Sequence, residues 1–212
     1  MKIDQSVVGK ALSAAYEKAI NGMEVKNVKV ADSAYDLARD YSKSGRTVRQ
    51  NATSLINWQC SKTGLTGFVT GLPGGFGMFA GVPADLTCVF FIQLRMIAAI
   101  AIMAGYDPKS DQVRTMSFAC LTGNSLETVL KEAGVTIGKK MATQYIKNRI
   151  TRETINKINQ AVGFRLVTKF GEKGVINLGK CVPFVGGVIG GAFDVASTKI
   201  IGKVAKKVFI ED

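Results

Sequence analysis

The sequence predicts an all-α protein, a compact multi-helix bundle with two glycine-rich apolar turns or hairpins. Apolar residues recur every three or four positions over several long segments, as they do on one face of an α-helix. No segment of convincing length alternates apolar and polar residues as a half-buried strand would. Two uncharged stretches, 63–84 and 181–193, combine several glycines with proline, a composition that favours turns.

The first sixty residues read as amphipathic helices. Apolar positions from Val7 to Met23 follow helical spacing, with charged residues on the other faces. A second helix is expected over 32–43, because Ser44-Gly45 would end it there, and a third is expected to start after Gly45 and to include Val48 and Gln59. These helices are expected to form a scaffold.

An apolar helix is expected from Pro83 to about Ala104. Proline fits the first turn of a helix, and the segment is apolar nearly all round, which indicates burial in a protein core or in lipid. Further helices are expected over 111–133, with an interruption at Gly123-Asn124, and over 135–147.

The C-terminal part carries the clearest helical pattern. Thr151 is expected to cap a helix whose apolar residues recur from Ile155 to Phe170. A last helix is expected after Asp194. The whole chain, 1–212, is interpreted as one domain with three parts: the N-terminal helices (1–60), the first run with its apolar helix (63–106), and the basic C-terminal helices with the second run (151–209).

The first glycine-rich run reaches the length of a membrane span. From Thr63 to Ala84 there are 22 residues without a charge, but seven glycines and Pro73 favour a bent element over a straight span. Contact with a membrane or partner and close packing within the protein both fit the two runs. The residues expected to make this contact are Gly71, Pro73, Gly74, Gly75, Phe76, Phe79, Pro183, Phe184, Gly186 and Gly187.

The net charge is +12, and the excess is mostly C-terminal. Residues 127–212 carry 15 basic against 7 acidic side chains, which favours an anionic surface as partner. The densest basic stretch contains a single aromatic residue, Tyr145, and so lacks a series of stacking platforms, which favours membrane lipid over nucleic acid. The residues expected to contact this surface are Lys139, Lys140, Lys147, Arg149 and Arg152.

Charged residues inside or beside apolar segments form a second candidate group. Asp85, Arg95, Arg165, Lys169 and Asp194 are expected to form a buried charge network. Internal ion pairs explain such residues, and a site for a ligand or lipid headgroup is the alternative. Asp85 and Arg95 are about 15 Å apart along one straight helix, so they are not expected to pair directly.

The composition argues against the common catalytic centres. The chain has no histidine, and its four cysteines lack metal-ligand spacing, so no metal and no cofactor are expected. The string from Gly174 to Cys181 is close to a phosphate-binding loop, but cysteine stands where serine or threonine should be. The N-terminus shows no signal peptide, which predicts a cytoplasmic protein.

Several strings resemble the bacterial EcsC family. They are GFVTGLPGGFG (67–77), PADL (83–86), LRMIAAIA (94–101) and, above all, VGFRLVTKFGEKGVINLGKCVPFVGGVIGGAFD (162–194). The family is named for a protein encoded beside an ABC transporter and is described as hydrophobic or membrane-associated. The resemblance therefore implies a location at the inner face of the cell membrane and a possible ABC-transporter partner. It supplies no catalytic residues.

Three functions fit these observations. The first is a cytoplasmic helical protein peripheral to the inner face of the membrane, which binds or scaffolds there without catalysis. The second is a soluble protein that holds an apolar ligand in a pocket walled by residues 82–106. The third is an enzyme that acts on a phosphate-containing substrate through Asp85, Asp194 and Arg95.

Overall fold

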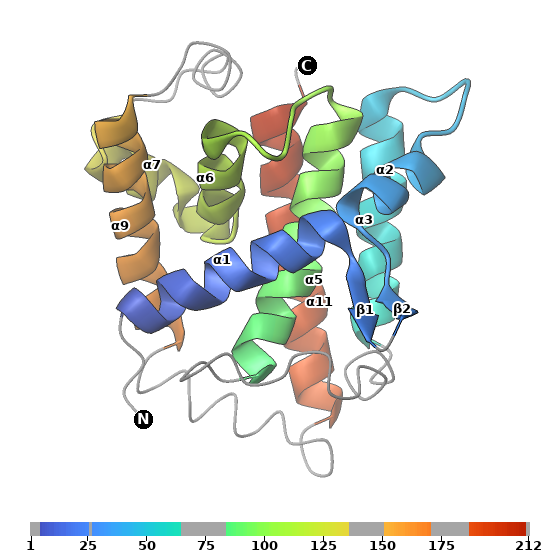
Figure 1. Ribbon diagram of the computed structural model, residues 1–212, viewed down its shortest axis with the longest axis horizontal. Helices are drawn as coiled ribbons and strands as arrows, with labels where there is room; N and C mark the ends of the chain where they lie inside the picture. The colour runs from blue at the N-terminus through green and yellow to red at the C-terminus, as the bar shows by residue number, and fades with distance from the viewer. Residues whose placement is uncertain (1–4, 26, 65–83, 136–150, 171–186, 211–212) are drawn as a thin grey trace.

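The centre of the fold is α5 (Ala84–Met103), whose residues 90–101 are all buried. The computed structural model describes residues 5–25, 27–64, 84–135, 151–170 and 187–210. Helices α1, α2, α3, α6 and α11 all pack against α5 (Figure 1). Because α5 has protein neighbours on several sides, nearly every one of its faces is apolar. The predicted apolar helix is confirmed, and residues 90–101 are buried in the protein core.

Helix α1 (Gln5–Asn21) crosses α5 and covers one side of it (Figure 1). Its buried residues recur every three or four positions, as the sequence predicts, and they form one face of the helix. These residues are Val8, Ala11, Leu12, Ala15, Tyr16, Ala19 and Ile20. The C-terminal end of α1 leads into the only strands in the described part of the chain.

The structure adds a short hairpin to the predicted helices. Strand β1 (Met23–Val25) pairs antiparallel with β2 (Val28–Ala31). Asn27 in the connection has φ 64°, a left-handed conformation that asparagine tolerates better than most residues. With strands of three and four residues, the hairpin leaves the all-α class unchanged.

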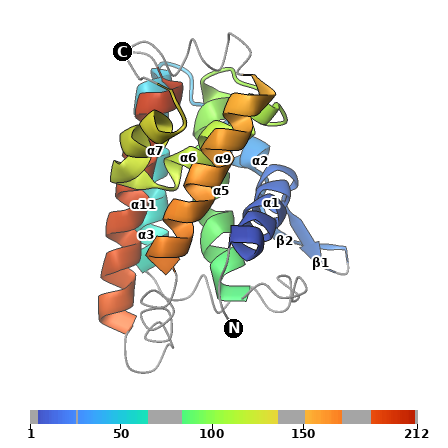
Figure 2. The ribbon, with the colours of Figure 1, turned by 90° about the vertical axis from the view of Figure 1, so that its left-hand side faces the viewer.

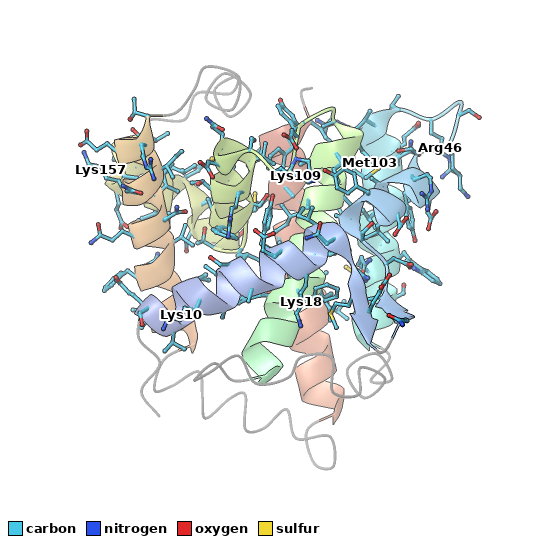
Figure 3. The ribbon with its side chains drawn as sticks, viewed as in Figure 1. Lys10, Lys18, Arg46, Met103, Lys109 and Lys157 are labelled. Carbon is cyan, nitrogen blue, oxygen red and sulfur yellow. The ribbon has the colours of Figure 1, made fainter. Side chains whose placement is uncertain are left out.

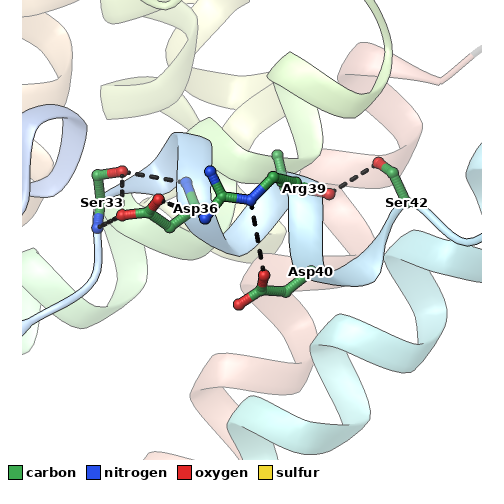
Figure 4. A network of polar contacts seen from close by, with 6 residues as sticks. Ser33, Asp36, Arg39, Asp40 and Ser42 are labelled. Atoms are coloured by element: carbon green, nitrogen blue, oxygen red, sulfur yellow. Dashed lines mark hydrogen bonds and ion pairs between the residues drawn. The ribbon is translucent and has the colours of Figure 1, made fainter.

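Helix α2 (Ala34–Tyr41) follows the hairpin and is fixed at both ends by side chains (Figure 4). The Ser33 hydroxyl accepts a hydrogen bond from the Asp36 backbone N–H at 3.0 Å, and the Asp36 carboxylate accepts one from the Ser33 N–H at 3.2 Å. Arg39 pairs with Asp36 at 2.8 Å. At the C-terminal end, the Ser42 hydroxyl donates to the carbonyl of residue 38 at 2.7 Å. The predicted helix over 32–43 is confirmed, with shorter bounds.

Helices α3 (Val48–Gly64) and α11 (Gly187–Phe209) lie side by side in opposite directions. Lys206 Nζ donates to Thr53 Oγ1 at 2.7 Å, whereas Cys60 Sγ contacts the Val195 carbonyl at 3.8 Å farther along. Between these contacts, Gly202 faces Ile56 so closely that an added Cβ would lie 2.6 Å from Ile56 Cγ1. The absence of a side chain at Gly202 therefore sets the separation of the two helices.

The start of α11 differs from the prediction. A helix was expected only after Asp194, but α11 begins at Gly187 and includes Gly190 and Gly191. Once a helix is nucleated, each further residue adds one backbone hydrogen bond, so the packed part of α11 can extend through weak helix formers. The second half of the run 181–193 is thus helical and not a turn.

The remaining helices follow the predicted order. Helix α6 (Asp111–Cys120) is separated from α7 (Leu126–Glu132) by a 3-10 turn, η1 (Gly123–Ser125), which confirms the expected interruption. Gly123 has φ +61°, which favours glycine there. Helix α9 (Arg152–Phe170) begins after Thr151, whose hydroxyl accepts from the backbone N–H of residue 154 at 3.3 Å. Of the helix predicted over 135–147, residues 136–147 lie outside the described residues.

Replacing Tyr16 by phenylalanine is expected to make stability less sensitive to alkaline pH. The Tyr16 hydroxyl donates to the Pro108 carbonyl at 2.8 Å, and burial raises the pKa of Tyr16 above its ordinary value. The unfolded chain releases this proton near pH 10, so the free energy of unfolding falls as pH rises above about 10. In Tyr16→Phe this part of the fall is absent, whereas at neutral pH the lost hydrogen bond costs about 1 kcal/mol.

Urea unfolding at neutral pH and at about pH 10.5 measures the effect of Tyr16→Phe. The wild-type protein should lose more stability between the two conditions than the variant. Equal losses would show that Tyr16 ionises alike in the folded and unfolded chains.

Candidate functional site

Both glycine-rich runs join the helical bundle at the same end. Helices α3 and α9 end there, at Gly64 and Phe170, and α5 and α11 begin there, at Ala84 and Gly187. Figures 1 and 2 both place these four helix ends at the lower side of the molecule. We call this region, defined by these four residues, the glycine-run end.

The predicted contact residues of the two runs stand mostly beyond the described part of the chain. Gly187 is the first residue of α11 and lies at the glycine-run end. The others lie outside the described residues: Gly71, Pro73, Gly74, Gly75, Phe76, Phe79, Pro183, Phe184 and Gly186. The structure therefore defines where the runs are attached.

Two exposed aromatic side chains lie near the glycine-run end. Trp58 on α3 is 49% exposed and Phe164 on α9 is 57% exposed. Each stands six residues before the end of its helix, roughly 9 Å along the axis. The other large hydrophobic side chains that are exposed among the described residues, Tyr35 and Val48, belong to α2 and the first turn of α3.

Phe164 is not among the predicted site residues, although the spacing of apolar residues in α9 contains a signal for it. The buried stripe of α9 contains Ile158, Val162 and Leu166, and Phe164 falls between its positions. A large apolar residue off the buried face of an amphipathic helix is exposed by geometry. It is therefore a candidate for contact with something outside the protein.

The one described member of the predicted anionic-surface group lies at the opposite end of α9. Arg152, the first residue of α9, is exposed and lies roughly 27 Å along the helix from Phe170. Figure 3 shows Lys157, Lys109 and Arg46 toward this upper end as well. The remaining predicted residues of this group lie outside the described residues: Lys139, Lys140, Lys147 and Arg149. Arg152 and the glycine-run end are thus two separate surfaces.

Arg95 is buried at the junction of α5 with the segment before α2. Its side chain is 3% exposed, its Nη1 donates to the Asp32 backbone carbonyl at 3.1 Å, and its guanidinium lies 5.1 Å from the centre of the Phe91 ring. Burial lowers the pKa of Arg95, and the nearby Asp32 charge opposes this shift. Asp32 is not among the predicted site residues, because the atom that accepts from Arg95 is a backbone carbonyl, which every residue type has.

The other members of the predicted charge network are only partly described. Helices α5, α9 and α11 carry Asp85, Lys169 and Asp194, but the side chains of these three residues lie outside the described part of the structure. Arg165 lines a groove between α9, α11 and η1. Arg95 and Arg165 therefore have different surroundings: the first contacts Asp32 and Phe91, and the second faces the groove.

The described residues contain no candidate metal site, since no three Cys, Asp or Glu side chains among them are grouped to hold an ion. Of the cysteines, Cys120 is buried, and burial raises the pKa of its thiol. Cys60 is half-buried, with its pKa raised by burial and lowered to a smaller extent by Lys199.

The described helices define an all-helical protein with an apolar helix at its centre and two glycine-rich runs attached at one end. None of these helices is long and apolar enough to cross a membrane. The chain belongs to the EcsC protein family, whose model matches residues 3–210 and confirms the resemblance of the quoted strings. No curated protein and no solved structure shows significant similarity to the chain.

Proposed function

We propose that this EcsC-family protein binds peripherally to the inner face of the bacterial cell membrane, with the glycine-run end against the lipid, and has a binding or scaffolding role there. The observation that carries the proposal is the attachment of both uncharged runs at one end of the bundle, beside the exposed Trp58 and Phe164. Exposed aromatic side chains at such a surface suit the interface between water and lipid.

Electrostatics supports the same partner. The chain carries a net charge of +12, and the cytoplasmic leaflet is negatively charged. Lys10 on α1 and Lys199 on α11 are exposed, and attraction of this kind acts over about 8–10 Å at physiological salt. A membrane protein such as an ABC transporter could also contact the glycine-run end. Binding to vesicles that contain only lipid would distinguish a lipid partner from a protein partner.

The two alternative functions have less support from the described residues. Residues 90–101 of α5, which were expected to wall an apolar pocket, are packed against protein on all faces. Arg95, proposed for a phosphate-containing substrate, is 3% exposed and already contacts Asp32 and Phe91. A substrate would have to displace these contacts to reach the guanidinium.

Trp58 allows a direct test, because it is the only tryptophan in the chain. The wild-type protein is expected to sediment with vesicles that contain phosphatidylglycerol and much less with pure phosphatidylcholine. On binding, the emission of Trp58 should shift to shorter wavelength and be quenched by lipids with brominated acyl chains, because the indole leaves water. Binding with unchanged Trp58 emission would contradict docking through the glycine-run end and favour the end near Arg152.

Phe164→Ser is expected to weaken vesicle binding by about 3- to 10-fold, since part of one phenylalanine side chain would stay in water. Tyr35→Ser removes an exposed aromatic residue from α2 and is the matched control. Absence of vesicle binding by the wild-type protein would overturn the proposal, and equal binding to neutral vesicles would overturn its electrostatic part.

A further inference from the structure

A groove of about 420 Å³ lies between α9, α11 and the η1 turn. Its floor is made of the buried residues Leu166, Ile201 and Thr122. The other lining residues come from the same three elements. Gly123 is buried, and the rest are half-buried or exposed: Asn124, Ser125, Arg165, Thr168, Ala196, Ser197 and Ile200. The volume falls in the range of small-molecule sites.

The polar side chains described in the groove are rich in donors. Among the described lining residues, Arg165 is the one that carries a charge, and none is Asp or Glu. Among the described residues, the side chains of Arg165, Asn124, Ser125 and Ser197 make no hydrogen bond or ion pair with one another or with their neighbours. A guanidinium, an amide and two hydroxyls are therefore available to an anion.

The remaining lining residues determine the shape of the groove and which of its hydroxyls are free to donate. Gly123, at φ +61°, lets η1 approach α11 so closely that an added Cβ would lie 3.3 Å from Ile200 Cγ2. The hydroxyl of Thr168 donates to the Arg165 carbonyl at 2.9 Å, and that of Thr122 donates to the carbonyl of residue 119 at 2.6 Å. The hydroxyl protons of both threonines are used within the protein, which leaves the side chains of Arg165, Asn124 and the two serines as donors.

We propose that this groove binds a phosphate group carried by a ligand with an apolar part. The Arg165 guanidinium would pair with two phosphate oxygens, a geometry for which arginine is suited, and the hydroxyls of Ser125 and Ser197 would donate to the same group. The apolar part would lie on Leu166, Ile200 and Ile201. Such a ligand is a phospholipid headgroup or a soluble phosphate ester, and the site does not depend on the proposed contact of the glycine-run end with the membrane.

Two probes distinguish a phospholipid headgroup from a soluble phosphate ester as the ligand of the groove. Dihexanoylphosphatidylglycerol, kept below its micelle concentration, presents a phosphodiester with short acyl chains, and inorganic phosphate presents the anion alone. Binding is measured by titration calorimetry and by NMR shifts of the groove amides, without vesicles. Binding of the lipid alone identifies a headgroup site, whereas binding of phosphate as well identifies a site open to soluble esters.

Arg165→Gln is expected to weaken the affinity for either probe by about 10- to 100-fold, because it removes the charged donor. Ser197→Leu should abolish binding by filling the groove. Arg152→Gln removes an exposed arginine from the other end of the same helix, and is expected to bind as the wild-type protein does. Thermal unfolding checks that each variant is folded.

The proposal is overturned if neither probe binds the wild-type protein, or if Arg165→Gln and Arg152→Gln bind equally well. Its outcome is separate from that of the membrane proposal, which is read from vesicle sedimentation and Trp58 emission. Loss of soluble-ligand binding with unchanged vesicle binding in Arg165→Gln would support two independent sites.

Discussion

Gly202→Ala is expected to lower the free energy of unfolding by about 1–3 kcal/mol, although alanine is normally the better helix former by about 1 kcal/mol. The added Cβ would lie 2.6, 2.9 and 3.0 Å from three side-chain carbons of Ile56. Ile56 is buried, so its side chain cannot move into solvent. Relief therefore requires α3 and α11 to separate, which weakens their long antiparallel contact.

Two comparisons make the Gly202 experiment specific. Gly163 lies inside α9, and among the described residues a Cβ there would meet only Gln5 Cγ, at 3.9 Å, so Gly163→Ala should be neutral or stabilising by up to about 1 kcal/mol. Ile56→Ala removes the three carbons that clash. In the Ile56→Ala background, Gly202→Ala should therefore cost much less than in the wild-type protein.

Urea unfolding curves of the four variants and the wild-type protein give these free energies. If Gly202→Ala and Gly163→Ala had the same effect, close packing at Gly202 would not set the α3–α11 separation. Additive effects of Gly202→Ala and Ile56→Ala would lead to the same conclusion.

Arg95→Ala is expected to destabilise the protein by about 2–5 kcal/mol. The change leaves a cavity beside α5 and removes the hydrogen bond from the guanidinium to the Asp32 carbonyl. Arg95→Met keeps most of the volume and needs no charge to be buried, so it should cost only a small part of this amount. Asp32 is exposed, which means that neither variant leaves a buried carboxylate alone.

The same pair of variants tests what Arg95 does. Thermal and urea unfolding measure stability, and vesicle sedimentation together with phosphate-probe titration measures binding at a temperature where both variants are folded. A structural role predicts lowered stability of Arg95→Ala with wild-type binding. Unchanged stability of Arg95→Met with binding reduced tenfold or more would instead assign Arg95 to a ligand site.

The helices were predictable because their signals are local. The spacing from Ile155 to Phe170 predicts α9, and the Gly123-Asn124 pair predicts the break between α6 and α7. The start of α11 was predicted too late, after Asp194 in place of Gly187, because glycine propensity alone does not include the extension of a packed helix. Family membership was predictable from the strings of residues 67–101 and 162–194.

The candidate sites were less predictable, because they depend on the path of the chain. The sequence identifies Arg95 and Arg165 as charges in unusual positions, but their surroundings come from other elements: Asp32 before α2 for one, and η1 with α11 for the other. The residues next to Gly202 in the chain give no reason for a glycine there, and only the approach of Ile56 on α3 shows why this position has no side chain.

By itself the sequence determined the helical class, the apolar centre, the uncharged runs and the family. Only the tertiary structure decided that α5 is surrounded by protein, that both runs attach at one end, and that Arg152 lies at the other end of α9. The physical reason is the separation along the chain of the residues that interact. Helical periodicity is set by neighbours three or four residues apart, whereas shared ends, grooves and buried partners are set by packing between segments far apart in the chain.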